Sequence, residues 1–207
     1  MTPALAQVVH PILLYGLELF RRLQRGENPS IEEEQARLVG MLAEQPVPEF
    51  NADRQGGFLG VRYALVCWLD ELFILESPWA SLWNENKLEA RLFGTNERAF
   101  RFWEQAQLAA SRPTPDALEV FFLAVLLGFS GDRAEEPALL NGWIASTRLQ
   151  LQQKRETVWA APPGLEPQTF VPLLRGRASL RTALMVSLLV ILALIPAAVL
   201  LMLRQGG

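Results

Sequence analysis

An uncharged stretch near the end of the chain limits most strongly what this sequence can fold into. Residues Ala183 to Leu203 contain no charged side chain, and Ser187 is the one hydrophilic residue in the stretch. As a helix it would be about 31 Å long, close to the thickness of a bilayer's hydrocarbon core. A soluble core helix does not need to be apolar on every face over this length. The stretch therefore predicts a single C-terminal transmembrane helix at residues 183–203, followed by a short tail at 204–207.

Arginines on both sides of this stretch predict its orientation. Arg175, Arg177 and Arg181 lie just before it, and Arg204 lies just after it. Positive charge is enriched on the cytoplasmic side of membrane helices, so the larger basic group predicts that the preceding residues are cytoplasmic. The apolar run at residues 8–20 has neither a basic segment before it nor a small-residue cleavage site after it, unlike a signal peptide. We therefore expect the main part of the chain to stay on the side where it is made.

Apolar residues before residue 160 recur at helical spacing, without sustained strand-type alternation. The first helix is expected to start near His10 and Pro11, Ser30 is expected to cap the second, and Thr95 is a candidate cap for a later one. The expected helices cover residues 8–25, 31–44, 58–75, 95–111, 114–127 and 137–156. The segment 58–75 is apolar nearly all round, which predicts the central helix of the fold. In the last helix we expect inward-facing side chains at Leu139, Leu140, Trp143, Ile144 and Leu151.

These patterns divide the chain into four parts. Residues 1–159 form an all-α head. Residues 160–182 contain four prolines and three arginines, which predicts a stiff juxtamembrane linker. The transmembrane helix at 183–203 and the tail at 204–207 complete the chain.

Composition excludes several functions for the head. The overall charge is −3, and the residues after 170 contain four arginines and no acids. Residues 1–170 therefore carry a charge of −7, which argues against nucleic-acid binding. Cys67 is the single cysteine and His10 the single histidine, which leaves little material for a zinc site or a Cys-His nucleophile pair. We expect Cys67 to be a small buried hydrophobe and His10 a surface or capping residue. No cofactor-binding loop is recognisable.

The adjacent acids Asp70 and Glu71 are the strongest candidates for a site. Two carboxylates within an apolar helix are suited to acid–base catalysis or metal binding. Neighbouring helix positions point about 100° apart, however, and do not converge on one atom. Pairing with Arg62 or another arginine, or capping of a neighbouring helix end, is the stronger interpretation, and a polar recognition site remains open.

Other motifs are read as structural or as surface. Gly128, Phe129 and Gly131 predict a tight turn between helices in which the glycines adopt positive φ and Phe129 packs into the core. Residues 85–97 alternate charges and aromatics, which is typical of a solvated helix face, and Glu85, Glu89 and Asp132 are expected on the surface. The six tryptophans are dispersed, so most are expected in the core.

Three motifs occur in a characteristic order: the helix from Arg62 to Glu71, then Ser77-Pro78-Trp79, then the Leu-Gly-Phe-Ser-Gly sequence at residues 127–131. Together with the apolar stretch they resemble the TssL (DotU/IcmH) family, inner-membrane components of type VI secretion systems. The resemblance covers about residues 5 to 205.

The resemblance implies a cytoplasmic, hook-like head of two packed helical bundles, with a periplasmic C-terminus and no enzymatic activity. The implied partners are an IcmF-like TssM protein, the baseplate component TssK and further copies of the same protein. Asp70 and Glu71 fall on the family's acidic pair, and Trp79 and Glu85 on or beside its connecting loop. We take these four residues as partner-interaction candidates.

Two other functions stay open at the sequence level. One is a tail-anchored adaptor of another pathway, for which the acidic head is a docking face. The other is a membrane-tethered enzyme that uses Asp70 and Glu71, and this requires a pocket where the carboxylates converge. Within the apolar stretch, Ala193, Pro196 and Ala197 suggest a kinked, small-residue face that packs against a partner helix in the lipid bilayer.

Overall fold

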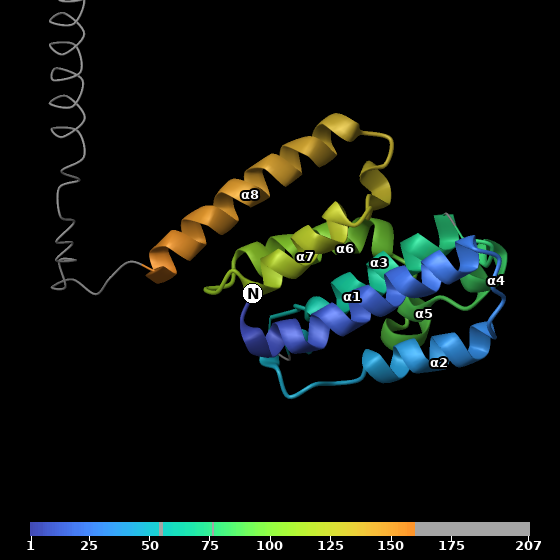
Figure 1. Cartoon of the computed structure of the whole chain (residues 1–207). Coiled ribbons are helices and arrows are strands. Elements are labelled where there is room, and N and C mark those ends of the chain that lie inside the picture. Colours follow the sequence, from blue (N-terminus) through green and yellow to red (C-terminus); the bar gives the residue numbers. More distant parts are fainter. Residues whose placement is uncertain (54–55, 76, 160–207) are drawn as a thin grey trace, which may run out of the picture. The chain divides into compact units, whose positions relative to one another are not determined.

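The computed structural model describes residues 1–53, 56–75 and 77–159, in which helices pack around a central helix (Figure 1). Its elements are α1 (Pro3–Gln24), α2 (Ile31–Met41), η1 (Pro48–Phe50), α3 (Val61–Leu75), α4 (Ala80–Glu85), α5 (Leu88–Phe93), α6 (Arg98–Ala110), α7 (Asp116–Leu126), η2 (Gly131–Arg133) and α8 (Pro137–Trp159). The described residues contain no strand, so the predicted all-α head is confirmed. The linker, the apolar stretch and the tail predicted for residues 160–207 lie outside the described residues.

Helix α3 is the central helix of the fold, as predicted. It packs against α1, α4, α5, α6, α7 and η1. Every residue from Tyr63 to Glu71 is buried, including the side chains of Tyr63, Cys67 and Trp68. The helix begins at Val61 rather than at residue 58, because Gly60 lies at φ +78° with its Cα against the carbonyls of Phe50 and Asn51. A Cβ added to Gly60 would lie 2.3 Å from the Phe50 carbonyl oxygen.

Helix α1 packs along α3 through a close contact at Gly16. A Cβ at this position would come within 2.7 Å of the Leu69 side chain and 2.9 Å of the Trp68 ring. The predicted helix start near Pro11 is wrong, because α1 begins at Pro3 and contains Pro11. Pro11 and the preceding-turn residue Gln7 are both exposed, so water can satisfy the carbonyl that lacks a helical donor.

Within the described residues, α1 has the length and apolar composition of a membrane-crossing helix. A third of its most apolar window is buried in the head, and its buried residues include Leu5, Val9 and Ile12. A core helix of a soluble protein meets the same criteria, and the packing of α1 on α3 agrees with that interpretation.

Local signals at the other helix ends are partly confirmed. Ser30 caps α2, because its side chain accepts a hydrogen bond from the Glu33 amide. Thr95 does not cap α6, which begins at Arg98 without a side-chain cap from its own N-terminal residue Glu97. Helix α8 contains the predicted 137–156 segment, buries Leu151, and packs Leu140, Trp143 and Ile144 against the core. Leu139 is exposed rather than inward, since it lies about 100° around the helix from Leu140.

Candidate functional site

Asp70 and Glu71 lie in the middle of the fold on α3, and they face different neighbours. Asp70 is 0 % exposed and Glu71 is 5 % exposed. Asp70 binds the first turn of α5, whereas Glu71 binds the turn that follows α7. The predicted divergence of adjacent helix positions is therefore observed, and the two carboxylates do not share a pocket.

Asp70 supplies the cap that α5 lacks in its own sequence. Lys87, the residue before α5, makes no side-chain cap, and α5 is a short helix of six residues. Asp70 Oδ1 accepts hydrogen bonds from the Leu88 amide at 2.9 Å and the Trp83 indole at 2.8 Å. Its Oδ2 accepts one from the Glu89 amide at 2.8 Å. A carboxylate from another helix thus satisfies the first free amides of α5 and complements its dipole.

Burial raises the pKa of the Asp70 carboxyl, and the hydrogen bonds from the Glu89 amide, the Trp83 indole and the Leu88 amide act in the opposite direction. No ion pair to Asp70 or Glu71 occurs within the described residues. Arg62 packs instead over the Phe93 ring, with its guanidinium carbon 5.1 Å from the ring centroid. The interpretation of the acidic pair as helix caps is therefore supported, and its pairing with Arg62 is wrong.

Glu89 continues the capping chain from α5 to α6. Its Oε1 accepts hydrogen bonds from Tyr63 Oη and Thr95 Oγ1, both at 2.8 Å, and from the Glu97 amide at 3.0 Å. Its Oε2 accepts one from the Arg98 amide, the first of α6, at 3.1 Å. The predicted surface position of Glu89 is wrong, since this side chain is 0 % exposed. Asp70 and Glu89 together tie three helices in series, and we call this pair the capping relay.

The aromatic groups around the capping relay are also enclosed. Burial raises the pKa of the Tyr63 phenol, and the nearby Cys67 and the hydrogen bond to Glu89 act in the same direction. Burial likewise raises the pKa of the Cys67 thiol well above its ordinary value, which agrees with its predicted role as a small buried hydrophobe. Trp79 is buried and lies parallel to Trp83, with ring centroids 6.1 Å apart. Glu85, at the end of α4, is exposed.

Glu71 organises the predicted turn after α7. Its Oε1 accepts hydrogen bonds from the Ser130 amide at 2.7 Å, the Ser130 hydroxyl at 3.0 Å and the Gly131 amide at 3.0 Å. Gly128 and Gly131 both have positive φ, at 107° and 56°, as predicted. Phe129 is buried against Phe102, with ring centroids 3.9 Å apart, so its predicted packing into the core is confirmed.

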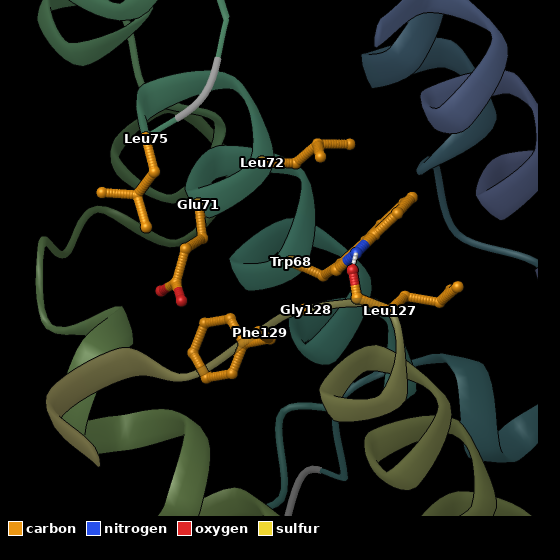
Figure 2. Close-up of a pocket in the computed structure, with 7 residues that line it drawn as sticks. All are labelled: Trp68, Glu71, Leu72, Leu75, Leu127, Gly128 and Phe129. Atoms are coloured by element: carbon orange, nitrogen blue, oxygen red, sulfur yellow. Dashed lines mark hydrogen bonds between the residues drawn. The ribbon is translucent and has the colours of Figure 1, made fainter. Parts of the chain in front are cut away.

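A small pocket of about 60 Å³ lies beside Glu71. Figure 2 shows its lining, which comes from α3 and from the segment after α7: Trp68, Glu71, Leu72, Leu75, Leu127, Gly128 and Phe129. The Trp68 indole donates to the Leu127 carbonyl at 3.2 Å and fixes one wall. All hydrogen bonds given to Glu71 by described residues go to Oε1, so Oε2 keeps its accepting capacity. Leu75, at the rim, is 63 % exposed.

The chemistry of this region is that of capping and packing. The described residues hold no group of three or more histidine, cysteine or carboxylate side chains that could bind a metal ion. Every oxygen of Asp70 already accepts a hydrogen bond, and Glu71 offers one oxygen beside an apolar pocket. This arrangement is suited to holding a surface in shape and to recognising a donor group on a partner.

The family model of the type VI secretion system protein DotU matches residues 4–204. This chain belongs to the DotU family. The family is a structural component of the secretion system and is not a known enzyme family. The fold is similar to the cytoplasmic domain of TssL from Acinetobacter baumannii, with a TM-score of 0.59 and 21 % sequence identity. That match covers 74 % of this chain and 99 % of the solved domain. A search of curated proteins gave no match.

Proposed function

We propose that this protein links the cytoplasmic baseplate of a type VI secretion system to an IcmF-like partner in the inner membrane. The observation that carries the proposal is the family match, which extends over residues 4–204 and so includes both the helical head and the apolar stretch at 183–203. In this proposal the apolar stretch is a single transmembrane anchor, the head is cytoplasmic, and residues 204–207 are periplasmic. The hook-like arrangement of two bundles that the resemblance implies belongs to the same proposal.

The pocket beside Glu71 is the proposed contact for a TssK-like baseplate component. Glu71 Oε2 has no donor among the described residues, and the exposed Leu75 offers apolar surface at the rim. A partner side chain with an N–H group would complete the hydrogen bonding of this carboxylate while apolar atoms cover the leucine. Glu71 would then act in recognition as well as in folding.

Asp70 and Trp79 are proposed to act indirectly, through the shape of the segment from residue 77 to residue 97. Asp70 is fully buried, and its hydrogen bonds hold the junction of α4 and α5. Trp79 packs on Trp83, whose indole also binds Asp70. Glu85, on the exposed surface of the same segment, is the proposed direct contact.

The membrane partner is proposed to pack against the apolar stretch. In this proposal Ala193 and Ala197 contribute small side chains and Pro196 a helix kink, which would permit close approach of a second helix. Self-association of the head is part of the same proposal. Bulky substitutions at Ala193 and Ala197 that leave assembly unchanged would contradict the packing role.

Co-purification of the full chain from membranes tests the proposed function. We expect recovery of an IcmF-like protein and a TssK-like protein with the unmodified chain. Glu71→Gln keeps the oxygen that caps the turn, so we expect the fold and the membrane partner to be retained. It replaces the acceptor Oε2 by an amide NH₂ group, so we expect recovery of the baseplate component to fall. Glu44→Gln, at an exposed position after α2, is the control for the same change of charge. Recovery of components of another pathway, without any secretion component, would favour the adaptor function and overturn this one.

A further inference from the structure

A second hollow lies on the head between α6, η2 and α8, next to the turn that Glu71 holds and without either residue of the acidic pair in its lining. It has a volume of about 250 Å³, and its lining comprises Phe100, Trp103, Glu104, Gln107, Asp132, Arg133 and Trp143. It continues along α6 towards Leu108 and Ser111. We call this hollow the α6–α8 groove.

Two of the three aromatic residues of the groove, Phe100 and Trp143, are only partly covered. Phe100 is 56 % exposed, although it is a large apolar side chain. Trp143 from α8 is half-buried and meets the edge of Trp103 from α6, with ring centroids 5.2 Å apart. Such partly covered aromatic surfaces are typical of binding sites.

The indole N–H of Trp103 is an unsatisfied hydrogen-bond donor among the described residues. The Trp103 side chain is buried and lines the groove. A buried donor without an acceptor is destabilising until an acceptor reaches it. A carbonyl oxygen brought to this N–H by an incoming segment would complete its hydrogen bonding.

The charges of the groove favour a basic occupant. Glu104 and Asp132 line it, are exposed, and form no ion pair within the described part of the chain. Glu135 and Glu136 follow on the same exposed connection. The one basic side chain in the lining, Arg133, lies over the Trp103 ring with its guanidinium carbon 3.9 Å from the ring centroid. Acidic charge is thus in excess, and an aromatic face already accommodates a guanidinium.

We propose that the α6–α8 groove binds a basic segment of a protein partner. An arginine or lysine of this segment lies between Glu104 and Asp132 and against Phe100 and Trp143. The segment displaces Arg133 from Trp103, and one of its main-chain carbonyls accepts the indole hydrogen bond. Arg133 is then an internal competitor for the site rather than a ligand-binding residue.

Binding of two labelled peptides to the full-length protein in neutral detergent tests this proposal. The probe is an eight-residue peptide of alternating arginine and glycine, and its counterpart has glutamate in place of arginine. We expect the basic peptide to bind more tightly, to weaken at higher salt, and to shift the Trp103 indole resonance in a ¹⁵N spectrum. That resonance is assigned with Trp103→Phe.

Two double variants distinguish binding in the groove from a general effect of the protein's net charge. Glu104→Gln with Asp132→Asn is expected to weaken binding about three- to tenfold, as for two exposed charge contacts. Glu33→Gln with Glu44→Gln removes the same charge from exposed positions elsewhere and is expected to change binding less than about twofold. Equal weakening by both pairs would overturn the proposal, as would the absence of any shift at Trp103.

Arg133→Ala decides the sign of the charge that the groove selects. If a basic segment displaces Arg133, removal of this side chain should strengthen binding of the basic peptide about two- to fivefold. Weaker binding of the basic peptide to Arg133→Ala would show that Arg133 supports the site and does not compete for it, and would overturn the proposal. Preferential binding of the glutamate peptide to the unmodified protein would also overturn it, because the groove would then select an acidic occupant.

Discussion

The two carboxylates of α3 are neighbours in sequence and differ in how completely the fold uses them. Asp70 accepts hydrogen bonds on both oxygens, and its partner in the relay, Glu89, is equally enclosed. Glu71 accepts all its described hydrogen bonds on one oxygen and lies beside a pocket. The first arrangement uses both oxygens within the fold, whereas the second leaves one oxygen that can accept from a partner. The two acids of this chain therefore do not form a single hydrogen-bonding unit.

The largest expected effect is at Glu89, the fully enclosed end of the relay. Glu89→Ala removes the acceptor of four donors and leaves a cavity, so we expect the free energy of unfolding to fall by about 3–4 kcal/mol. For a chain of this size that is a fall of roughly 10 °C in Tm. Thermal unfolding of the detergent-solubilised chain, followed by circular dichroism, measures it.

The exposed Glu85, four positions earlier, is the control for Glu89. Glu85→Ala should change the free energy of unfolding by about 0.5 kcal/mol or less. A loss below about 1 kcal/mol in Glu89→Ala would contradict the structural role of the relay.

Amide substitutions at the acidic pair test the comparison directly. Both oxygens of Asp70 accept hydrogen bonds, and Asp70→Asn replaces one of them by an NH₂ donor that faces an N–H group. We therefore expect the free energy of unfolding to fall by about 2–3 kcal/mol. Glu71→Gln keeps the single oxygen that caps the turn, and we expect about 1 kcal/mol. Urea unfolding of both variants under identical conditions gives the difference. Equal losses would mean that both oxygens of Glu71 are needed for folding.

Two glycines of the turn held by Glu71 form a further matched pair. A Cβ at Gly131 would lie 2.5 Å from the Ala99 carbonyl oxygen, whereas one at Gly128 meets nothing within 4 Å. Both residues have positive φ, so both alanine variants are strained, and Gly131→Ala also clashes with backbone. We expect the free energy of unfolding to fall by about 2–3 kcal/mol in Gly131→Ala and by about 1 kcal/mol in Gly128→Ala. The comparison of their Tm values is the measurement, and a reversed order would refute the close approach at Gly131.

Sequence patterns predicted this turn because its signals are local. Two glycines flank an aromatic residue between apolar helices, and positive φ and inward packing follow from those residue types alone. The central helix was predictable for the same reason, since α3 is apolar on nearly every face. The start of the helix that Ser30 caps was also predictable, because a serine followed by acids is a local signal of a helix N-terminus.

The capping relay was not predictable in this way, because its donors come from distant positions. Glu89 occurs among alternating charges that suggest a solvated surface, yet it binds Tyr63 of α3 and the amides of residues 97 and 98. Thr95 has the residue type of a cap, but it donates to Glu89 instead. Leu139 fits the apolar spacing of α8 and is exposed, because spacing does not specify where the core ends. The partner roles of Asp70, Glu71, Trp79 and Glu85 stay predictions.

Tyr63 offers the most specific test of the enclosed side of α3. Tyr63→Phe removes the hydroxyl that donates to Glu89, so we expect a loss of about 1–2 kcal/mol at neutral pH. Because burial raises the folded-state pKa of this phenol, its stabilising contribution is complete below the ordinary tyrosine pKa of about 10 and declines as the pH rises above it. The stability difference between the unmodified chain and Tyr63→Phe should therefore narrow between about pH 10 and pH 11. A difference that stays constant over this range would mean that the phenol titrates normally, and hence that the relay is open to water where the structure encloses it.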